Sequence, residues 1–283
     1  MLSLWSEQEA KACKNELELR VYTSRLLGRD PSLVLHGGGN TSVKITEKNA
    51  VNEAEEILYI KGSGWDLETI ETAGFAPVRL QPMIKLAELD ALTDPQMVNE
   101  LKTRLTRADA PAPSVETILH AVLPFRYVDH THADAVVTIT NTADGHKRIE
   151  EIYGDQVVVI PYVMPGFDLA RDVARLFAEH AGPRTIGMVL MNHGVFSFAD
   201  SARESYERMI HLIDMAERYL DAHNAWDLEA LSEDKSKGRS RLEIAKLRQA
   251  VSAKAGRPMI LHVTNSVRGR AFARRDDVGT ISQ

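Results

Sequence analysis

The sequence predicts a layered α/β domain, and two observations carry this prediction. Short apolar runs typical of strands alternate with amphipathic helical patterns in the middle of the chain: a run at 157–163, a helical pattern over 168–180, and a second run at 186–191. The second observation is size. A chain of 283 residues with 44% hydrophobic content can bury the core of one large domain, or of a domain with an appendage.

The N-terminal part is predicted to contain one helix and two strands. Apolar residues recur at helical spacing over 6–27, and a glycine and a proline then end that pattern. The single cysteine, Cys13, lies in this helix, so an internal disulfide is excluded and a buried apolar role is expected. Two β-rich runs follow at 41–45 and 57–61, and each ends in turn-forming residues.

Helical patterns dominate the remainder of the larger domain. Beyond the first helix, the predicted helices lie at 83–92, 95–107, 115–123, 168–180 and 201–222. Ser114 is placed to cap the helix at 115–123, and Ser201 begins the last of them in capping-box spacing with Glu204. A further strand is expected at 195–198.

A change in composition predicts a boundary near residue 230. Residues 1–230 are predicted as the catalytic domain and residues 231–283 as a C-terminal extension. The extension opens with the polar stretch SEDKSKGRSR, at 232–241, and is predicted to contain a helix over 242–253 and a strand over 259–263. A surface loop within a single domain explains the polar stretch equally well.

Charge and hydropathy exclude two classes of partner. The net charge is −6, and the basic residues are scattered among acidic ones, so no basic field for nucleic acid is expected. No apolar run approaches the ~18 residues that cross a bilayer. We therefore expect a cytoplasmic protein that binds neither nucleic acid nor a membrane.

The stretch LHGGGNTSVKI, residues 35–45, is the clearest candidate for a binding loop. Its first glycines fit a dinucleotide fingerprint at Gly37 and Gly39, but Ser42 occupies the third glycine position and no helix pattern follows. The lysine of a P-loop is also missing. A cradle of backbone N–H groups for a phosphate and a tight turn both remain compatible with the three glycines.

Three histidines have the spacing of a metal site. His130 and His132 are two residues apart, so in an extended segment both imidazoles lie on one face, and His193 lies between two apolar runs. Three neutral imidazoles with open positions are typical of catalytic zinc. Asp129 and Asp134 flank the pair and can orient it as hydrogen-bond acceptors. Alternatively, the pair lies on a strand with satisfied hydrogen bonds or points into solvent.

Glu116 has two interpretations. In the first turn of a helix an acidic residue complements the helix dipole. On a rigid element just before the histidine pair it can instead act as a general acid/base. His120 lies four residues further along the same face, as a fourth ligand or an orienting partner, and a structural role is favoured.

Five motifs in this order resemble the class II aldolase/adducin family. They are HGGGNTSVKI, IKGSGWDLETIETAGF, PSVETILH, DHTHAD and MNHGVFSFADSARESYERM. The resemblance covers residues from about 15 to 280, and it is strongest to the aldolase half of bifunctional rhamnulose-1-phosphate aldolase/lactaldehyde dehydrogenases.

The resemblance implies a three-layer α/β/α domain with a largely antiparallel central sheet, in homo-oligomers, expected to be tetramers. It assigns Zn²⁺ or another divalent metal to His130, His132 and His193, and catalysis to Glu116. It assigns the substrate phosphate to Gly39, Asn40, Ser63, Gly64 and Ser114. Segment 133–140, which looks strand-like by composition, is implied to be a helix.

Two departures from the family pattern matter. The bifunctional relatives continue into a dehydrogenase, whereas this chain stops at Gln283, so no redox half is expected. No tyrosine clearly matches the one that the family uses near its substrate.

The resemblance implies retro-aldol cleavage of a ketose 1-phosphate through a metal-stabilised enediolate. L-Rhamnulose 1-phosphate is the leading candidate substrate, and its products would be dihydroxyacetone phosphate and L-lactaldehyde. The small phosphorylated sugar is the expected partner. Two alternative functions are compatible with the same resemblance. One is a sugar-phosphate 4-epimerase or a hydroxy-acid decarboxylase, which uses the same ion, and the other is a non-enzymatic adducin-like module, which keeps the fold without the chemistry.

Overall fold

The computed structural model describes residues 1–225, 240–263, 266–276 and 278–281. The chain divides into two units, residues 1–223 and residues 224–283, and each is described by itself. The predicted boundary near residue 230 and most of the polar stretch at 232–241 lie outside the described residues.

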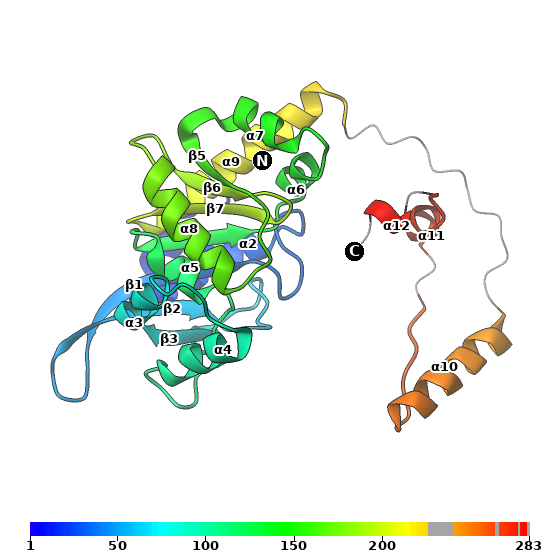
Figure 1. The fold of residues 1–283 in the computed structure, drawn as a ribbon, viewed down its shortest axis with the longest axis horizontal. Helices are drawn as coiled ribbons and strands as arrows, with labels where there is room; N and C mark the ends of the chain where they lie inside the picture. Colours follow the sequence, from blue (N-terminus) through cyan, green and yellow to red (C-terminus); the bar gives the residue numbers. More distant parts are fainter. Residues whose placement is uncertain (226–239, 264–265, 277, 282–283) are drawn as a thin grey trace. The chain divides into compact units, whose positions relative to one another are not determined.

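A seven-stranded sheet forms the centre of the first unit, in the order β3-β2-β1-β4-β7-β6-β5 (Figure 1). Every neighbouring pair is antiparallel except β5 and β6, which are parallel, so the predicted largely antiparallel sheet is confirmed. The strands are β1 (Asn40–Lys48), β2 (Ala54–Lys61), β3 (Phe75–Arg79), β4 (Tyr127–Thr131), β5 (Val157–Ile160), β6 (Gly187–Leu190) and β7 (Gly194–Ala199).

Both faces of this sheet are covered by helices, which makes three layers. Side chains alternate along a strand, so Met188 and Leu190 of β6 enter one core while Val189 enters the other. The first core packs against α3 (Leu80–Leu86), α4 (Asp94–Thr103), α5 (Thr117–Val122) and α8 (Phe167–His180). The second packs against α2 (Glu16–Gly28), α6 (Asp134–Thr140), α7 (Gly145–Tyr153) and α9 (Ala202–Ala222).

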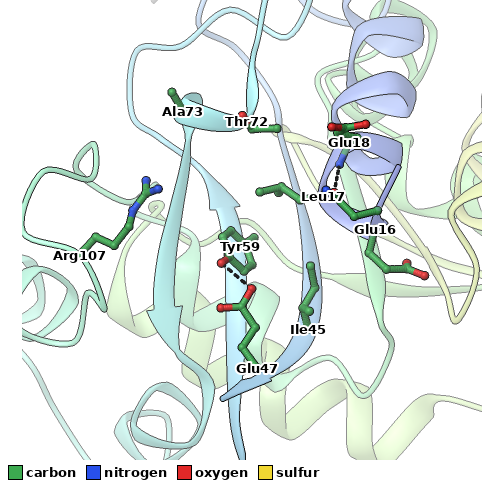
Figure 2. Close-up of a pocket in the computed structure, with 10 residues that line it drawn as sticks. Glu16, Leu17, Glu18, Ile45, Glu47, Tyr59, Thr72, Ala73 and Arg107 are labelled. Carbon is green, nitrogen blue, oxygen red and sulfur yellow. Dashed lines mark hydrogen bonds between the residues drawn. The ribbon is translucent and has the colours of Figure 1, made fainter. Parts of the chain in front are cut away.

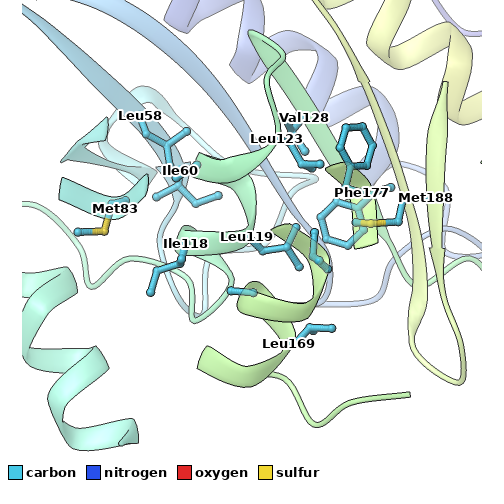
Figure 3. Close-up of a cluster of buried hydrophobic side chains, with 14 of the residues drawn as sticks. Leu58, Ile60, Met83, Ile118, Leu119, Leu123, Val128, Leu169, Phe177 and Met188 are labelled. Carbon is cyan, nitrogen blue, oxygen red and sulfur yellow. The ribbon is translucent and has the colours of Figure 1, made fainter. Parts of the chain in front are cut away.

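Figure 3 shows the first of these cores. Ile118 and Leu119 of α5 lie between Ile60 of β2 and the side chains of α8, including Phe177. This packing fixes α5 on the sheet. The helix that begins beside Glu116 is therefore anchored by its apolar face.

The opening helix differs from the prediction. The predicted helix over 6–27 is two helices, α1 (Glu7–Ala12) and α2, because Asn15 caps a new helix by accepting the N–H of Glu18. Cys13 ends α1 and is half-buried, with its thiol directed to the carbonyl of Glu9, so the predicted buried position inside a helix was wrong.

Several other boundaries also moved. The predicted helix over 83–92 lies instead at Leu80–Leu86, the helix over 95–107 ends at Thr103, and the strand over 157–163 ends at Ile160. Ser114 does not cap α5, because Glu116 occupies the N-cap position. Segment 133–140 is the helix α6, as the family resemblance implied.

Some elements were not anticipated. Strand β3 lies at the sheet edge and contains Pro77, which an edge strand tolerates because one side needs no N–H donor. Strand β4 is buried along its whole length, so it lacks the alternation that marks a half-exposed strand. The helix α7 and two short 3₁₀ helices, η1 (Thr72–Gly74) and η2 (Gly154–Gln156), complete the unit.

The described part of the second unit is helical. It contains α10 (Arg241–Ala255), α11 (Val267–Ala273) and α12 (Val278–Ile281). A capping box between Ser240 and Glu243 starts α10. The predicted strand over 259–263 was wrong, since these residues have no regular structure and Met259 is tied back to α10 through Ser252 and Arg248.

A membrane-spanning helix is not found in the described part of the chain: each helix there is too short or too polar to cross a bilayer.

Candidate metal and active site

The three predicted metal histidines lie together at one end of strands β4, β6 and β7, in the interior of the sheet order. His130 is the fourth residue of β4, His132 follows the end of that strand, and His193 lies in the turn between β6 and β7. One ligand nitrogen from each lies within 4.8 Å of the other two. His130 is buried, His193 is half-buried and His132 is exposed, so the cluster opens to solvent on the side of His132.

The turn that presents His193 depends on a glycine. Asn192 has a positive φ of 58°, which reverses the chain between β6 and β7. A Cβ at Gly194 would lie 2.4 Å from the carbonyl oxygen of Thr131 and 2.9 Å from Cε1 of His130. Only glycine allows β7 to approach β4 this closely beside the cluster.

The imidazoles are neutral and present lone pairs. Burial lowers the pKa of all three, and most strongly that of His130. His130 Nδ1 is 3.1 Å from the carbonyl oxygen of Val195, and a carbonyl only accepts, so Nδ1 carries the proton. The free lone pair of His130 is then on Nε2, which lies 3.1 Å from His132 Nε2.

Glu116 faces this cluster. Its carboxylate is buried, and its two oxygens lie 3.6 Å from Nε2 of His130 and 3.6 Å from Nε2 of His193. Burial raises the pKa of Glu116, against the opposing effects of His193, Asn40 and Lys61. Glu116 is the N-cap residue of α5, and its side chain makes no capping hydrogen bond; its carboxylate lies against Asn40 and the histidines instead.

A buried chain of hydrogen bonds fixes that carboxylate. Asn40 donates through Nδ2 to Glu116 at 2.5 Å and to Ser114 Oγ at 3.2 Å. The Asn40 carbonyl oxygen accepts from Nε2 of His120, and Nδ1 of His120 lies 2.8 Å from the hydroxyl of Ser42. His120 is therefore the orienting partner that the sequence left as one alternative, and it is outside the three-histidine cluster.

The two aspartates do not orient the histidines. Asp129 points to the opposite face of β4 from His130, where it pairs with Arg20 at 2.5 Å and accepts from Ser205. Asp134 is in the first turn of α6. The predicted contact of Asp129 was wrong because adjacent strand residues face opposite sides, and the backbone carbonyl of Val195 orients His130 instead.

The predicted phosphate residues converge beside Glu116. The glycine loop packs against the turn at Gly62–Gly64, since a Cβ on Gly37 would lie only 3.6 Å from Cα of Gly64. Ser114 lies next to the start of this turn, because its N–H donates to the carbonyl of Lys61 at 3.3 Å. Gly39 and Gly64 have φ of 60° and 82°, a conformation that favours glycine.

Sequence reasoning did not single out Lys61. This residue ends β2, is only 2% exposed, and donates to the carbonyls of Gly37 and Trp65 at 2.9 and 2.6 Å. The feature of the sequence that could have indicated it is a charged residue at the end of an apolar run, immediately before Gly62-Ser63-Gly64.

Within the described residues no tyrosine hydroxyl is hydrogen-bonded to the three histidines or Glu116. Tyr162 is half-exposed and lies two residues after the end of β5. The last residue of β5, Ile160, pairs with Leu190, the last residue of β6, and β6 leads into the turn with His193.

The donor set fits a divalent cation. One nitrogen of each of the three neutral imidazoles lies within 4.8 Å of the other two, and such nitrogens are among the ligands that zinc takes in proteins. Nδ1 of His193 and Oε1 of Glu116 are buried without a hydrogen-bond partner in the described structure. Buried lone pairs and an unpaired carboxylate oxygen are costly unless a cation or proton donor meets them.

A separate cavity of about 550 Å³ lies on another part of the first unit (Figure 2). Glu16, Glu47, Tyr59 and Arg107 line it, and Tyr59 donates to Glu47 at 2.7 Å. None of the nine predicted site residues lines this cavity. The candidate site is therefore identified by its chemistry and not by this hollow.

Comparison with known proteins gives one family match. The model of the class II aldolase and adducin N-terminal domain matches residues 18–220. A relative from Bacillus subtilis (strain 168), named uncharacterized oxidoreductase YuxG, is 35% identical over 218 residues, which are 77% of this chain and 31% of the relative. The chain thus spans about a third of the length of the curated relative it matches.

Two solved structures illustrate the fold. The N-terminal class II aldolase domain of a conserved protein from Thermoplasma acidophilum superposes with a TM-score of 0.71 and 41% identity, covering 78% of this chain and 99% of that one. YgbL from Klebsiella pneumoniae superposes with a TM-score of 0.52 and 20% identity, covering 82% and 97%. At this lower identity the likeness concerns the fold alone.

Proposed function

This chain belongs to the class II aldolase/adducin family, and we propose that it is a metal-dependent lyase acting on a ketose 1-phosphate. The products are dihydroxyacetone phosphate and an aldehyde. Among such substrates we propose L-rhamnulose 1-phosphate, which gives L-lactaldehyde, on the resemblance of the five sequence motifs. The observation that supports the proposal best is the buried carboxylate of Glu116 facing three neutral histidines, next to the glycine turns.

His130, His132 and His193 would hold the divalent ion, which we propose to be Zn²⁺. When bound, it supplies positive charge that stabilises the negative charge developing on the ketone fragment as the C3–C4 bond breaks. Because the ligands are neutral imidazoles, they leave that positive charge undiminished.

Glu116 would move the proton at the carbon that carries the electron pair. As the C3–C4 bond breaks, the C4 hydroxyl releases its proton to solvent and becomes the aldehyde carbonyl, while the electron pair of the bond stays on C3 of the ketone fragment. A proton must then reach C3 before dihydroxyacetone phosphate can leave. Burial raises the pKa of Glu116, which favours the protonated form that can donate. In the direction of synthesis the carboxylate of Glu116 removes the same proton. The hydrogen bond from Asn40 holds this carboxylate in place for both steps.

The turns at Gly39, Asn40, Ser63, Gly64 and Ser114 would hold the substrate phosphate. Ser63 and Gly64 are exposed, so an anion can reach them from solvent. Both donors of the Asn40 amide are already used by Glu116 and Ser114, so this residue would join the phosphate turns to the catalytic carboxylate. We further propose a cytoplasmic homo-oligomer, a tetramer by resemblance, whose small-molecule partner is the phosphorylated sugar.

A substrate panel tests the proposed reaction. The metal-loaded protein is incubated with several ketose 1-phosphates, and dihydroxyacetone phosphate is measured with a coupled assay. We expect cleavage of L-rhamnulose 1-phosphate to be the fastest. Inversion at C4 without cleavage would identify an epimerase, release of CO₂ from a hydroxy acid would identify a decarboxylase, and no turnover with any substrate would favour an adducin-like binding module.

A further inference from the structure

A cavity of about 580 Å³ lies beside the C-terminal end of α5, whereas Glu116 is at the N-terminal end of that helix. Residues of β1, β2, α3 and α5 line it, together with the segment 124–126. None of the nine predicted site residues lines this cavity, so it is separate from the candidate active site. Its volume is in the range of pockets that hold small molecules.

The walls of this cavity are largely apolar. Leu80 of α3 and Ala121 of α5 are buried members of the first core. Ile84, Val122 and Phe125 are partly buried and pack against the same core. Because the core holds these side chains in place, a ligand in the cavity would bury its hydrocarbon part against a preformed apolar surface.

Lys44 of β1 brings a positive charge to these apolar walls. Its ammonium donates to the carbonyl of Leu123, which uses one of its three donors. Among the described residues no carboxylate lies within ion-pair distance of this ammonium, and Glu56 and Asp200 act on it only at longer range. Burial lowers the pKa of Lys44 to about 8, so the group is still largely protonated at neutral pH. A buried ammonium without an anionic partner is costly, and a bound anion would offset that cost.

The other charged groups around the cavity already have partners. The guanidinium of Arg126 lies 3.5 Å from Glu16 and donates to the backbone carbonyl of Lys44 at 3.4 Å. Glu56 is exposed and accepts a hydrogen bond from Gln81 at 2.8 Å. Lys44 is therefore the cation that a ligand would meet. With Glu56 nearby, a singly charged anion is favoured over a doubly charged one, because like charges repel.

We propose that this cavity is a second ligand site, which takes a small aliphatic monocarboxylate. The carboxylate of the ligand pairs with the ammonium of Lys44, and its hydrocarbon chain lies against Leu80, Ile84 and Val122. The inference does not depend on the proposed function, because the cavity is outside the predicted site.

Isothermal titration calorimetry with three probes tests the proposal: acetate, hexanoate and the neutral amide hexanamide. The probes are titrated into the unmodified protein and into Lys44→Met, which removes the charge. Lys48→Met is the matched control, because Lys48 is on the same strand and two alternations further along the same face, but is exposed and does not line the cavity. His193→Ala is a second control, since a carboxylate can also bind a metal ion.

We expect hexanoate to bind the unmodified protein more tightly than acetate, because its additional CH₂ groups become buried. Hexanamide should bind at least about tenfold more weakly than hexanoate, because it lacks the hydrogen bonds that the charge strengthens. Lys44→Met should raise the Kd for hexanoate at least about tenfold and leave the Kd for hexanamide nearly unchanged. Lys48→Met and His193→Ala should bind hexanoate like the unmodified protein.

Equal Kd values for hexanoate in the unmodified protein and in Lys44→Met would overturn the inference. Loss of hexanoate binding in His193→Ala would overturn it too, since the carboxylate would then lie on the metal site. If Lys44→Met does not fold, Lys44→Gln gives the same comparison, because glutamine keeps a neutral donor for the carbonyl of Leu123. Absence of hexanoate binding to the unmodified protein would also reject the proposal, and a smaller oligomer of Lys44→Met in size-exclusion chromatography would then identify a second copy of the chain as the occupant.

Discussion

At the scale of single residues, the candidate chemistry depends on how one carboxylate is held. Glu116 receives a hydrogen bond from Asn40, which is itself fixed by His120, and His120 in turn contacts Ser42. Each link is buried, so each is protected from competing water. This chain places the carboxylate 3.6 Å from two of the three histidines.

Glu116→Gln tests the assigned role of the carboxylate. Glutamine keeps the shape and can still contact Asn40, but it cannot exchange a proton, and a general acid/base contributes roughly 10²–10⁴-fold. We expect kcat to fall by about that factor while metal content and thermal stability are retained. Steady-state kinetics and metal analysis of the purified variant measure this. Normal specific activity would show that Glu116 is merely part of the helix start.

Asn40→Ala tests whether the hydrogen-bond chain serves catalysis as well as phosphate binding. The change leaves Glu116 and His120 without their shared partner, and a hydrogen bond to a charged group contributes about 1.5–3 kcal/mol. We therefore expect kcat to fall about tenfold or more for phosphorylated and free ketose alike. A change confined to the KM of the phosphorylated ketose would contradict this and limit Asn40 to the phosphate.

At the scale of elements, β4 separates two functions on its two faces. His130 points to the candidate site, while its neighbour Asp129 forms a fully buried pair with Arg20 of α2. The guanidinium of Arg20 also contacts the carbonyl of Ser42 on β1, so the pair joins α2, β1 and β4 behind the histidines. We interpret it as the support that keeps β4 in place.

Arg20→Met is expected to lower the free energy of unfolding by about 3–5 kcal/mol, because it leaves Asp129 buried without its partner. Urea denaturation measures this loss. The double variant Arg20→Met with Asp129→Leu is the control, since replacing both charges by apolar groups is far less costly than removing one. A single variant as stable as the unmodified protein would show that the pair does not support β4.

The sequence predicted the features that depend on neighbouring residues, and it missed features that depend on contacts between residues far apart in the chain. The spacing of His130 and His132 is visible in the sequence, whereas the partner of Asp129 lies at position 20, far along the chain. Asn15 divided the first helix because a cap competes with continuation of the helical pattern. The run at 259–263 has apolar content but no partner strand among the described residues, and a strand needs pairing to form.

At the scale of the whole molecule, the sheet order assembles the site from segments far apart in the sequence. Strands β1, β4 and β7 are neighbours, and their register places Asn40 opposite His130 and Thr131 opposite Val195. The glycine loop, the histidine pair and the turn with His193 therefore meet at one end of these central strands. The motifs indicated which residues belong together, but Lys61 emerged only from the packing of the turns.

The claim on which the account depends most is that these three histidines hold a metal ion required for cleavage of a ketose 1-phosphate. The decisive measurement is a titration: protein stripped by a chelator is returned stepwise to Zn²⁺, and dihydroxyacetone phosphate release from L-rhamnulose 1-phosphate is followed. We expect no activity in the stripped protein and a linear recovery that saturates at about one ion per chain, as a single three-histidine site requires. Undiminished activity in protein shown to be free of metal would contradict the account.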